Sequence, residues 1–317
     1  MDGDWRPTIS IEAMIERART LEAIRAFFAR RGVIEVDTPV LSRTTVTDPA
    51  IDSFALLADG ERRYLQTSPE YQMKRLLAAG APSIVRIGPV FRAEESGRLH
   101  NPEFTMIEWY RLGFDLPLLM DEVEALVDLV LGVGHYRRIS YRQLLLEGAG
   151  VASIDDPEAV LGDALRRNGI ELSTNATVDR RDMLDLLVAH AIEALGPGRF
   201  FITDYPPDQA ALARLVTDSH GYAAAARFEL IVDAVEIANG YHELADADVL
   251  AQRMAQDRAV RARSGREQPA ADDRLLAAMR HGLPDCAGVA LGFDRLMMLH
   301  LRVDRLDQAM PFSSARA

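Results

Sequence analysis

Residues 91–110, FRAEESGRLHNPEFTMIEWY, carry the strongest structural signal in this chain. Apolar runs on both sides of a charged loop predict a β-hairpin. Arg92 is an always-charged planar donor that suits a phosphate, Glu94 can accept from an exocyclic amine, and Phe104 offers a ring for stacking. Together these residues favour a clamp for a nucleotide. A charged hairpin on a solvated surface is the alternative for so short a motif.

Outward from this hairpin, helical and strand-like periods alternate along the chain. Apolar residues recur at helical spacing at 11–28, 70–79, 116–131, 246–263 and 275–281. Strand-like segments lie at 33–36, 53–57, 63–67, 84–92, 104–111, 200–203, 227–232, 235–238 and 288–293. Ala58-Asp59-Gly60 is a turn signal, and Pro39 places strand 33–36 at an edge or a bulge, because proline cannot donate to a ladder. Hairpin connections predict a mostly antiparallel sheet flanked by helices rather than a doubly wound parallel one.

The composition predicts a soluble globular protein. Of 317 residues 48% are hydrophobic, and charges interrupt each apolar run before the roughly 20 residues that a membrane span needs. No basic region followed by an apolar stretch opens the sequence, so we expect a cytoplasmic protein without a membrane partner. A net charge of −12 opposes non-specific binding to nucleic acid, and the single Cys286 excludes an internal disulfide.

Three segments resemble, in order, motifs 1, 2 and 3 of class II aminoacyl-tRNA synthetases: residues 32–41, the 91–110 hairpin, and GVALGFDR at 288–295. Within that class, three further segments resemble the catalytic domain of lysyl-tRNA synthetase: TSPEY at 67–71, HNPEFTMIE at 100–108 and EIANGYHE at 236–243. The similarity runs from about Ser10 to the C-terminus. It implies an α+β fold with a mixed, mostly antiparallel sheet flanked by helices.

The expected organisation is one catalytic domain over residues 1–317. The stretch 136–198 is locally helical, resembles the family least, and is expected to be an insertion packed on the main sheet. No anticodon-binding domain is expected.

The resemblance implies a site for ATP. Forming an acyl-adenylate brings a carboxylate to the α-phosphate although both are negative, so the site needs fixed positive charge and in-line positioning. By the resemblance, Arg92 contacts the α-phosphate and Arg295 the γ-phosphate, and these two are the expected catalytic residues. The other residues expected to bind ATP are Glu94, His100, Asn101, Phe104, Glu236, Ile237 and Gly292. Among them Glu94 and Asn101 read the adenine and Phe104 stacks on it. Glu229 and Glu236 are expected to hold Mg²⁺, because hard cations prefer oxygen ligands.

Several of these residues also have an ordinary structural interpretation. Glu229 and Glu236 could be solvated charges on strands, since glutamates are mostly exposed. Arg295 could cap a helix or pair with Asp294, and Phe104 could belong to the core. The matched order of all the motifs favours the site over these alternatives.

The acidic residues indicate the amino acid that is activated. By the resemblance, Glu70 binds its amino group, Asn239 its carboxylate, and the distal ammonium is received by Glu108, Tyr110 and Glu243. Ser68, Pro69 and Ala290 complete the expected substrate site. Carboxylates around a buried ammonium offset its desolvation, so a diamino acid is expected. Ala290 replaces a glycine of the lysyl family, and its methyl group should penalise α-lysine and favour an isomer with a shifted amino group.

The acceptor is inferred from what the sequence lacks. Lysyl-tRNA synthetases carry an anticodon-binding β-barrel before the catalytic domain, and the segment before Ser10 leaves no room for one. This pattern resembles the truncated lysyl-like ligases that adenylate (R)-β-lysine and transfer it to a lysine ε-amine of elongation factor P. We therefore expect ATP, Mg²⁺ and elongation factor P as partners, without transfer RNA, and motif 1 around Pro39 favours a homodimer. A truncated synthetase that uses α-lysine and a non-catalytic amino-acid sensor are the alternatives.

Overall fold

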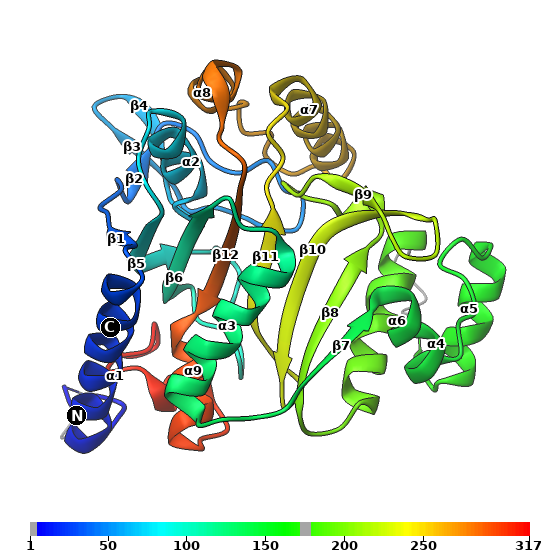
Figure 1. The fold of residues 1–317 in the computed structure, drawn as a ribbon, viewed down its shortest axis with the longest axis horizontal. Coiled ribbons are helices and arrows are strands. Elements are labelled where there is room, and N and C mark those ends of the chain that lie inside the picture. Colours follow the sequence, from blue (N-terminus) through cyan, green and yellow to red (C-terminus); the bar gives the residue numbers. More distant parts are fainter. Residues whose placement is uncertain (1–4, 172–178) are drawn as a thin grey trace. The chain divides into compact units, whose positions relative to one another are not determined.

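The computed structural model describes residues 5–171 and 179–317. Its contacts divide the chain into two compact units, the first made of Met1–Val133 with Gly240–Ala317 and the second of Gly134–Asn239. In Figure 1 the first unit runs from blue to green and again from yellow to red. The three segments that resemble class II motifs all belong to this first unit.

The main sheet of the first unit contains the hairpin that the sequence predicts. β5 (Ile84–Phe91) pairs antiparallel with β6 (Glu103–Leu112) along its full length. On the other side of β6 lies antiparallel β12 (Cys286–Gly292). β1 (Ile34–Glu35) pairs parallel with β5, so the order is β1-β5-β6-β12 with β1 at the edge. Pro39 therefore follows an edge strand, as the sequence predicts.

A three-stranded sheet connects β1 to the next helix. β3 (Ala55–Ala58) and β4 (Glu61–Leu65) form an antiparallel hairpin, and β2 (Leu41–Ser42) pairs with β4. Asp59 and Gly60 adopt positive φ angles of 54° and 75°, the conformation of a two-residue hairpin turn. The predicted turn is confirmed, whereas β2 is too short to give a periodic signal.

Helices of the first unit begin and end close to where the sequence predicts them. α1 (Ile11–Arg30) is capped by the Ser10 hydroxyl and α3 (Leu116–Leu131) by the Asp115 carboxylate. α3 packs against β12, and α9 (Phe293–Leu301) packs against β6 (Figure 1). The other helical segments are α2 (Glu70–Ala78), α7 (Ala247–Arg263), α8 (Asp273–Gly282) and the 3-10 turn η2 (Leu306–Ala309).

The second unit combines strands with the helices of the region 136–198. Its strand order is β11 (Val235–His242), β10 (Ala223–Val232), β8 (Arg199–Tyr205) and β7 (Tyr136–Ser140), with β9 (Leu215–Thr217) beside β10. β11 continues into the first unit at Gly240. Helices α4 (Tyr141–Ala149) and α6 (Arg180–Ala194) pack together, and α5 (Glu158–Arg167) contacts α6 (Figure 1). The 3-10 turn η1 (Pro207–Gln209) follows β8.

Both units contain parallel and antiparallel strand pairs, with antiparallel pairs in the majority. This confirms the α+β fold with a mixed, mostly antiparallel sheet. The sequence predicts helices from residue 136 onward, whereas Tyr136–Ser140 form β7. Only Ile139 of this strand is buried, so the alternation that marks a strand is missing. Residues 172–178 of the predicted insertion lie outside the described residues.

Among the described residues, we find no helix with the length and apolarity required to cross a bilayer.

Candidate active site

Arg92 follows β5 and lies over the ring of Phe104 from β6. Its guanidinium carbon is 5.2 Å from the ring centroid. Nη1 makes an ion pair of 3.4 Å with Glu95 Oε1, and Nε has no hydrogen-bond partner within the described part of the chain. The side chain is 26% exposed. The structure therefore brings Arg92 and Phe104 together, and the stacked guanidinium keeps donors available for an anion.

Arg295 contacts the loop of the hairpin through His100. Arg295 Nη2 lies 2.8 Å from His100 Nε2. Burial, followed by the charge of Arg295, lowers the pKa of His100, so a neutral imidazole can accept from the guanidinium. Asp294, which the sequence offers as an alternative partner for Arg295, is buried in an ion pair with Arg17 and accepts from the backbone N–H of Thr105 at 2.5 Å. These contacts fix the start of α9 against β6.

The other predicted adenine-binding residues of the first unit lie in or beside the same hairpin. Glu94 is exposed and has a positive φ of 65°, a left-handed conformation that turns the loop. Asn101 is buried, donating from Nδ2 to Glu103 O at 2.6 Å and accepting at Oδ1 from Ser314 N–H at 3.0 Å. Gly292 ends β12 directly before α9. Asn101 thus braces the loop, and its predicted contact with adenine stays a prediction.

A buried group of charges lies where the sequence predicts the amino-acid site. Lys74 Nζ is 2.6 Å from Glu70 Oε1 and 2.6 Å from Glu243 Oε2. Glu108 accepts from the hydroxyls of Ser68 and Tyr110, both at 2.7 Å. We call Glu70, Glu108, Glu243 and Lys74 the glutamate–lysine cluster. Pro69 precedes α2, which carries two of its members.

Burial controls the electrostatics of the glutamate–lysine cluster. It raises the pKa of Glu108 to about 7, with the charge of Glu70 adding to the effect and the Ser68 and Tyr110 hydroxyls opposing it. Burial likewise raises the pKa of Glu243 to about 8, against the opposing charge of Lys74. For Lys74 burial acts downward, but Glu243 and Glu70 together raise its pKa well above the ordinary value. Near neutral pH the cluster therefore holds protons that an incoming ammonium would displace.

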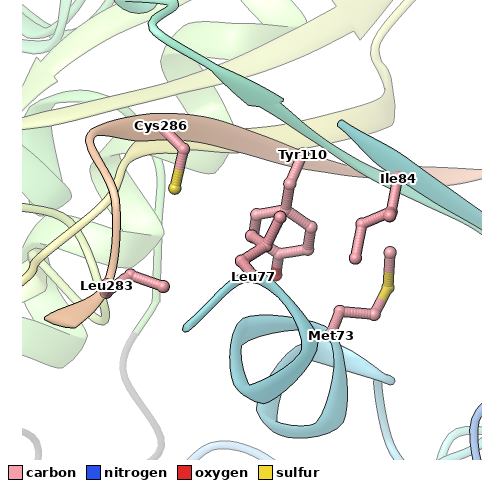
Figure 2. Packing of buried hydrophobic residues seen from close by; sticks show 6 residues of the cluster. All are labelled: Met73, Leu77, Ile84, Tyr110, Leu283 and Cys286. Atoms are coloured by element: carbon pink, nitrogen blue, oxygen red, sulfur yellow. The ribbon is translucent and has the colours of Figure 1, made fainter. Parts of the chain in front are cut away.

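Apolar packing fixes the ring of Tyr110 beside the cluster. Figure 2 shows Tyr110 between Met73 and Leu77 of α2 and the buried Cys286 of β12. Gly288 pairs directly with Tyr110 across β12 and β6. A β-carbon at Gly288 would lie 2.4 Å from Tyr110 Cε1 and 2.5 Å from Glu243 Oε1. Only glycine at this position leaves room for both side chains.

The second unit carries the predicted metal ligands. Glu229 forms an ion pair with Arg227 and accepts from Asn239 Nδ2 at 3.2 Å. Burial raises the pKa of Glu229, Arg227 opposes this, and the charge of Glu236 adds to it. Glu236 is exposed and Ile237 is buried. The two carboxylates therefore interact electrostatically, which fits a pair that shares a hard cation.

A cavity of about 260 Å³ adjoins Glu229 within the second unit. Polar side chains on its wall include Tyr141, Asp185, Tyr205, Gln209 and Arg227. The cavity extends the polar surface around Glu229 towards α6.

Three residues of these arrangements are not among the site residues that the sequence predicts, although Gly288 belongs to the segment 288–295. Lys74 stands four residues after Glu70, a spacing typical of a helical ion pair, and this was the available signal. Arg227 and Gly288 act through contacts with Glu229 and Glu243, which local sequence does not reveal.

Comparison with known proteins agrees with the motif assignment. The family model of class II tRNA synthetases (D, K and N) matches residues 4–316. The elongation factor P–(R)-β-lysine ligase of Vibrio parahaemolyticus is 44% identical over 99% of this chain and 100% of that protein. The ligase of the same name from Yersinia enterocolitica is 42% identical over 99% of this chain and 98% of that protein. The one from Vibrio cholerae is also 42% identical, over 100% of this chain and 99% of that protein. This chain therefore belongs to the class II tRNA synthetase family.

Proposed function

We propose that this protein is an ATP-dependent, AMP-forming ligase that activates (R)-β-lysine and transfers it to the ε-amine of a lysine on elongation factor P. One observation supports this function above the others: three carboxylates, the buried Glu108 and Glu243 and the 12% exposed Glu70, lie around the buried Lys74 ammonium. Such a site matches a substrate with two amino groups. The names of relatives aligned over nearly their whole length indicate the same reaction.

In the first step the substrate carboxylate attacks the α-phosphate of ATP, forming the acyl-adenylate and releasing pyrophosphate. Arg92 stabilises the charge that develops on the α-phosphate, while Phe104 holds the adenine by stacking. Arg295, oriented by His100, binds the γ-phosphate. Glu229 and Glu236 would hold Mg²⁺, which would supply positive charge to offset the phosphate oxygens.

In the second step the acceptor amine, in its neutral form, attacks the adenylate carbonyl. The amide C–N bond forms, the C–O bond to the phosphate breaks, and AMP leaves. We further propose a cytoplasmic homodimer that uses no transfer RNA.

The decisive experiment supplies the protein with ATP, Mg²⁺ and either α-lysine or (R)-β-lysine, together with elongation factor P or transfer RNA. We expect elongation factor P to gain the mass of one lysyl residue. The modified fraction should be larger with (R)-β-lysine than with α-lysine. A gain on transfer RNA alone would identify a truncated synthetase, and absence of any pyrophosphate exchange would identify an amino-acid sensor.

Ala290→Gly should shift the choice of amino acid towards α-lysine. Ala290 pairs directly with Glu108, so its methyl group lies on the face of the sheet that carries this carboxylate. We expect the ratio of kcat/KM for α-lysine to that for (R)-β-lysine to rise by about tenfold, the effect of one methyl group in a pocket. An unchanged ratio in pyrophosphate exchange would show that Ala290 does not set specificity.

Binding of (R)-β-lysine should weaken as the pH falls. Glu108, with a pKa of about 7, and Glu243, with a pKa of about 8, must lose their protons before they can pair with an ammonium. Because protons and substrate compete at both carboxylates, KM for the amino acid should rise by up to about tenfold per pH unit between 8 and 7 and by up to about a hundredfold per unit below 7. Pyrophosphate exchange across this range measures the effect. A KM that stays constant would separate these carboxylates from the substrate.

A further inference from the structure

Lys74 carries an ammonium group that is almost completely buried. It lies on α2 with 1% of its side chain exposed, next to Met73 and Leu77, which face the apolar packing around Tyr110 (Figure 2). Removing an ammonium from water is costly unless several charged partners surround it. Glu70 and Glu243 supply these partners at 2.6 Å each. Neither step of the proposed reaction requires Lys74.

Lys74 is unsuited to act as a nucleophile, even though the proposed acceptor is itself a lysine. A nucleophilic amine must be neutral, whereas Glu243 and Glu70 raise the pKa of Lys74 despite its burial. Its nitrogen thus carries no free lone pair at physiological pH. This leaves electrostatic and geometric roles.

The charges around Lys74 match a substrate with two ammonium groups. Glu70, Glu108 and Glu243 carry −3 when ionised and Lys74 carries +1, which leaves −2. Arg86 of β5 lies opposite Glu108 and also interacts electrostatically with Asp37. Arg86 and Asp37 carry opposite charges, so together they add no net charge. The other titratable groups close to the cluster are Tyr71 of α2, Tyr110 of β6, Asp257 of α7 and Asp272 at the start of α8. The two tyrosines are neutral because burial raises their pKa values.

We propose that Lys74 is the positioning residue that sets diamino-acid specificity: its ammonium bridges Glu70 and Glu243, holds both carboxylates at fixed geometry and leaves negative charge for two substrate ammonium groups. The inference rests on the proposed function. Without Lys74, three neighbouring carboxylates, two of them buried, would repel one another and retain protons to a higher pH. The substrate would then face a pocket with fewer ionised carboxylates in fixed positions.

Lys74→Met tests this role, because methionine keeps the length of the side chain and removes the charge. We expect KM for (R)-β-lysine at neutral pH to rise by about 100-fold, while kcat at saturation stays within about threefold of the wild type. The acid limb of kcat/KM should move upward by at least about one pH unit, because Lys74 lowers the pKa of both Glu108 and Glu243. Pyrophosphate exchange against pH measures both effects.

Two further variants keep the experiment decisive. Lys74→Gln retains a hydrogen-bond donor without the charge and should show the same shift of the acid limb, so it replaces Lys74→Met if that protein fails to fold. Met73→Leu, a swap of similar volume at the neighbouring buried position, should leave the limb where it is.

The possible outcomes separate the inference from the function on which it rests. If the wild type exchanges pyrophosphate with (R)-β-lysine and both Lys74 variants keep its pH profile and KM, Lys74 is only a structural ion pair. If the wild type activates no diamino acid, the proposed function itself is wrong. A shifted limb in Met73→Leu as well would assign the effect to packing of α2.

Discussion

Gly288→Ala is expected to lower kcat/KM for (R)-β-lysine by about 100-fold or more while the protein stays folded. The new β-carbon would lie 2.4 Å from Tyr110 Cε1 and 2.5 Å from Glu243 Oε1, so at least one of these side chains must move. Overpacking of this kind costs about 1–3 kcal/mol. The Tyr110 ring is held between α2 and β12, so we expect Glu243 to move and to lose its contact with Lys74.

Gly162→Ala provides the matched control for this substitution. Gly162 lies within α5, and among the described residues a β-carbon there would have only Arg166 Nη1 within 4 Å, at 3.9 Å. Pyrophosphate exchange should be unchanged in this variant, and thermal unfolding should show both proteins folded. If Gly288→Ala retains the wild-type KM for the amino acid, Tyr110 and Glu243 do not form its binding site.

Short-range patterns predicted most of the fold. Helical periodicity located α1 and α3, and the turn at Asp59-Gly60 located a hairpin, because each signal lies within a few adjacent residues. β7 was not predicted, because it has a single buried residue and pairs with β8, which is distant in the chain. Its formation depends on a non-local partner rather than on its own residues.

The motif resemblance predicted residues for the site that the structure brings close together. Motif resemblance predicted Arg92, Glu108 and Glu243, and the structure places the latter two in one cluster. Lys74 and Gly288 act on other side chains, so their importance depends on distances that the fold creates. Residues that position another side chain thus require the structure, whereas the candidate binding residues could be proposed from motifs alone.

Arg92→Lys is expected to lower the rate of adenylate formation by about 100-fold, although it preserves the positive charge. The guanidinium lies 5.2 Å from the Phe104 ring centroid and presents a planar fork of donors to an anion, whereas an ammonium offers a point charge with a different reach. Removing the charge as well, in Arg92→Ala, should cost about 1000-fold, which is the effect of deleting a donor that stabilises a developing oxyanion. Because the missing interaction strengthens in the transition state, kcat should fall more than KM for ATP rises. Single-turnover formation of the adenylate measures this step directly.

Arg98→Ala controls for the folding of the hairpin loop, because Arg98 is exposed in the same loop and its Nη1 donates to Asp304 O at 3.2 Å. We expect its adenylation rate to stay within about threefold of the wild type, as for most exposed positions away from a site. Equal losses in Arg98→Ala and Arg92→Ala would mean that the loop needs its arginines for structure, and the α-phosphate contact would have to be assigned elsewhere. A loss confined to the Arg92 variants, graded from lysine to alanine, is what a guanidinium on the reacting phosphate requires, since the charge and the geometry then contribute separately to the same transition state.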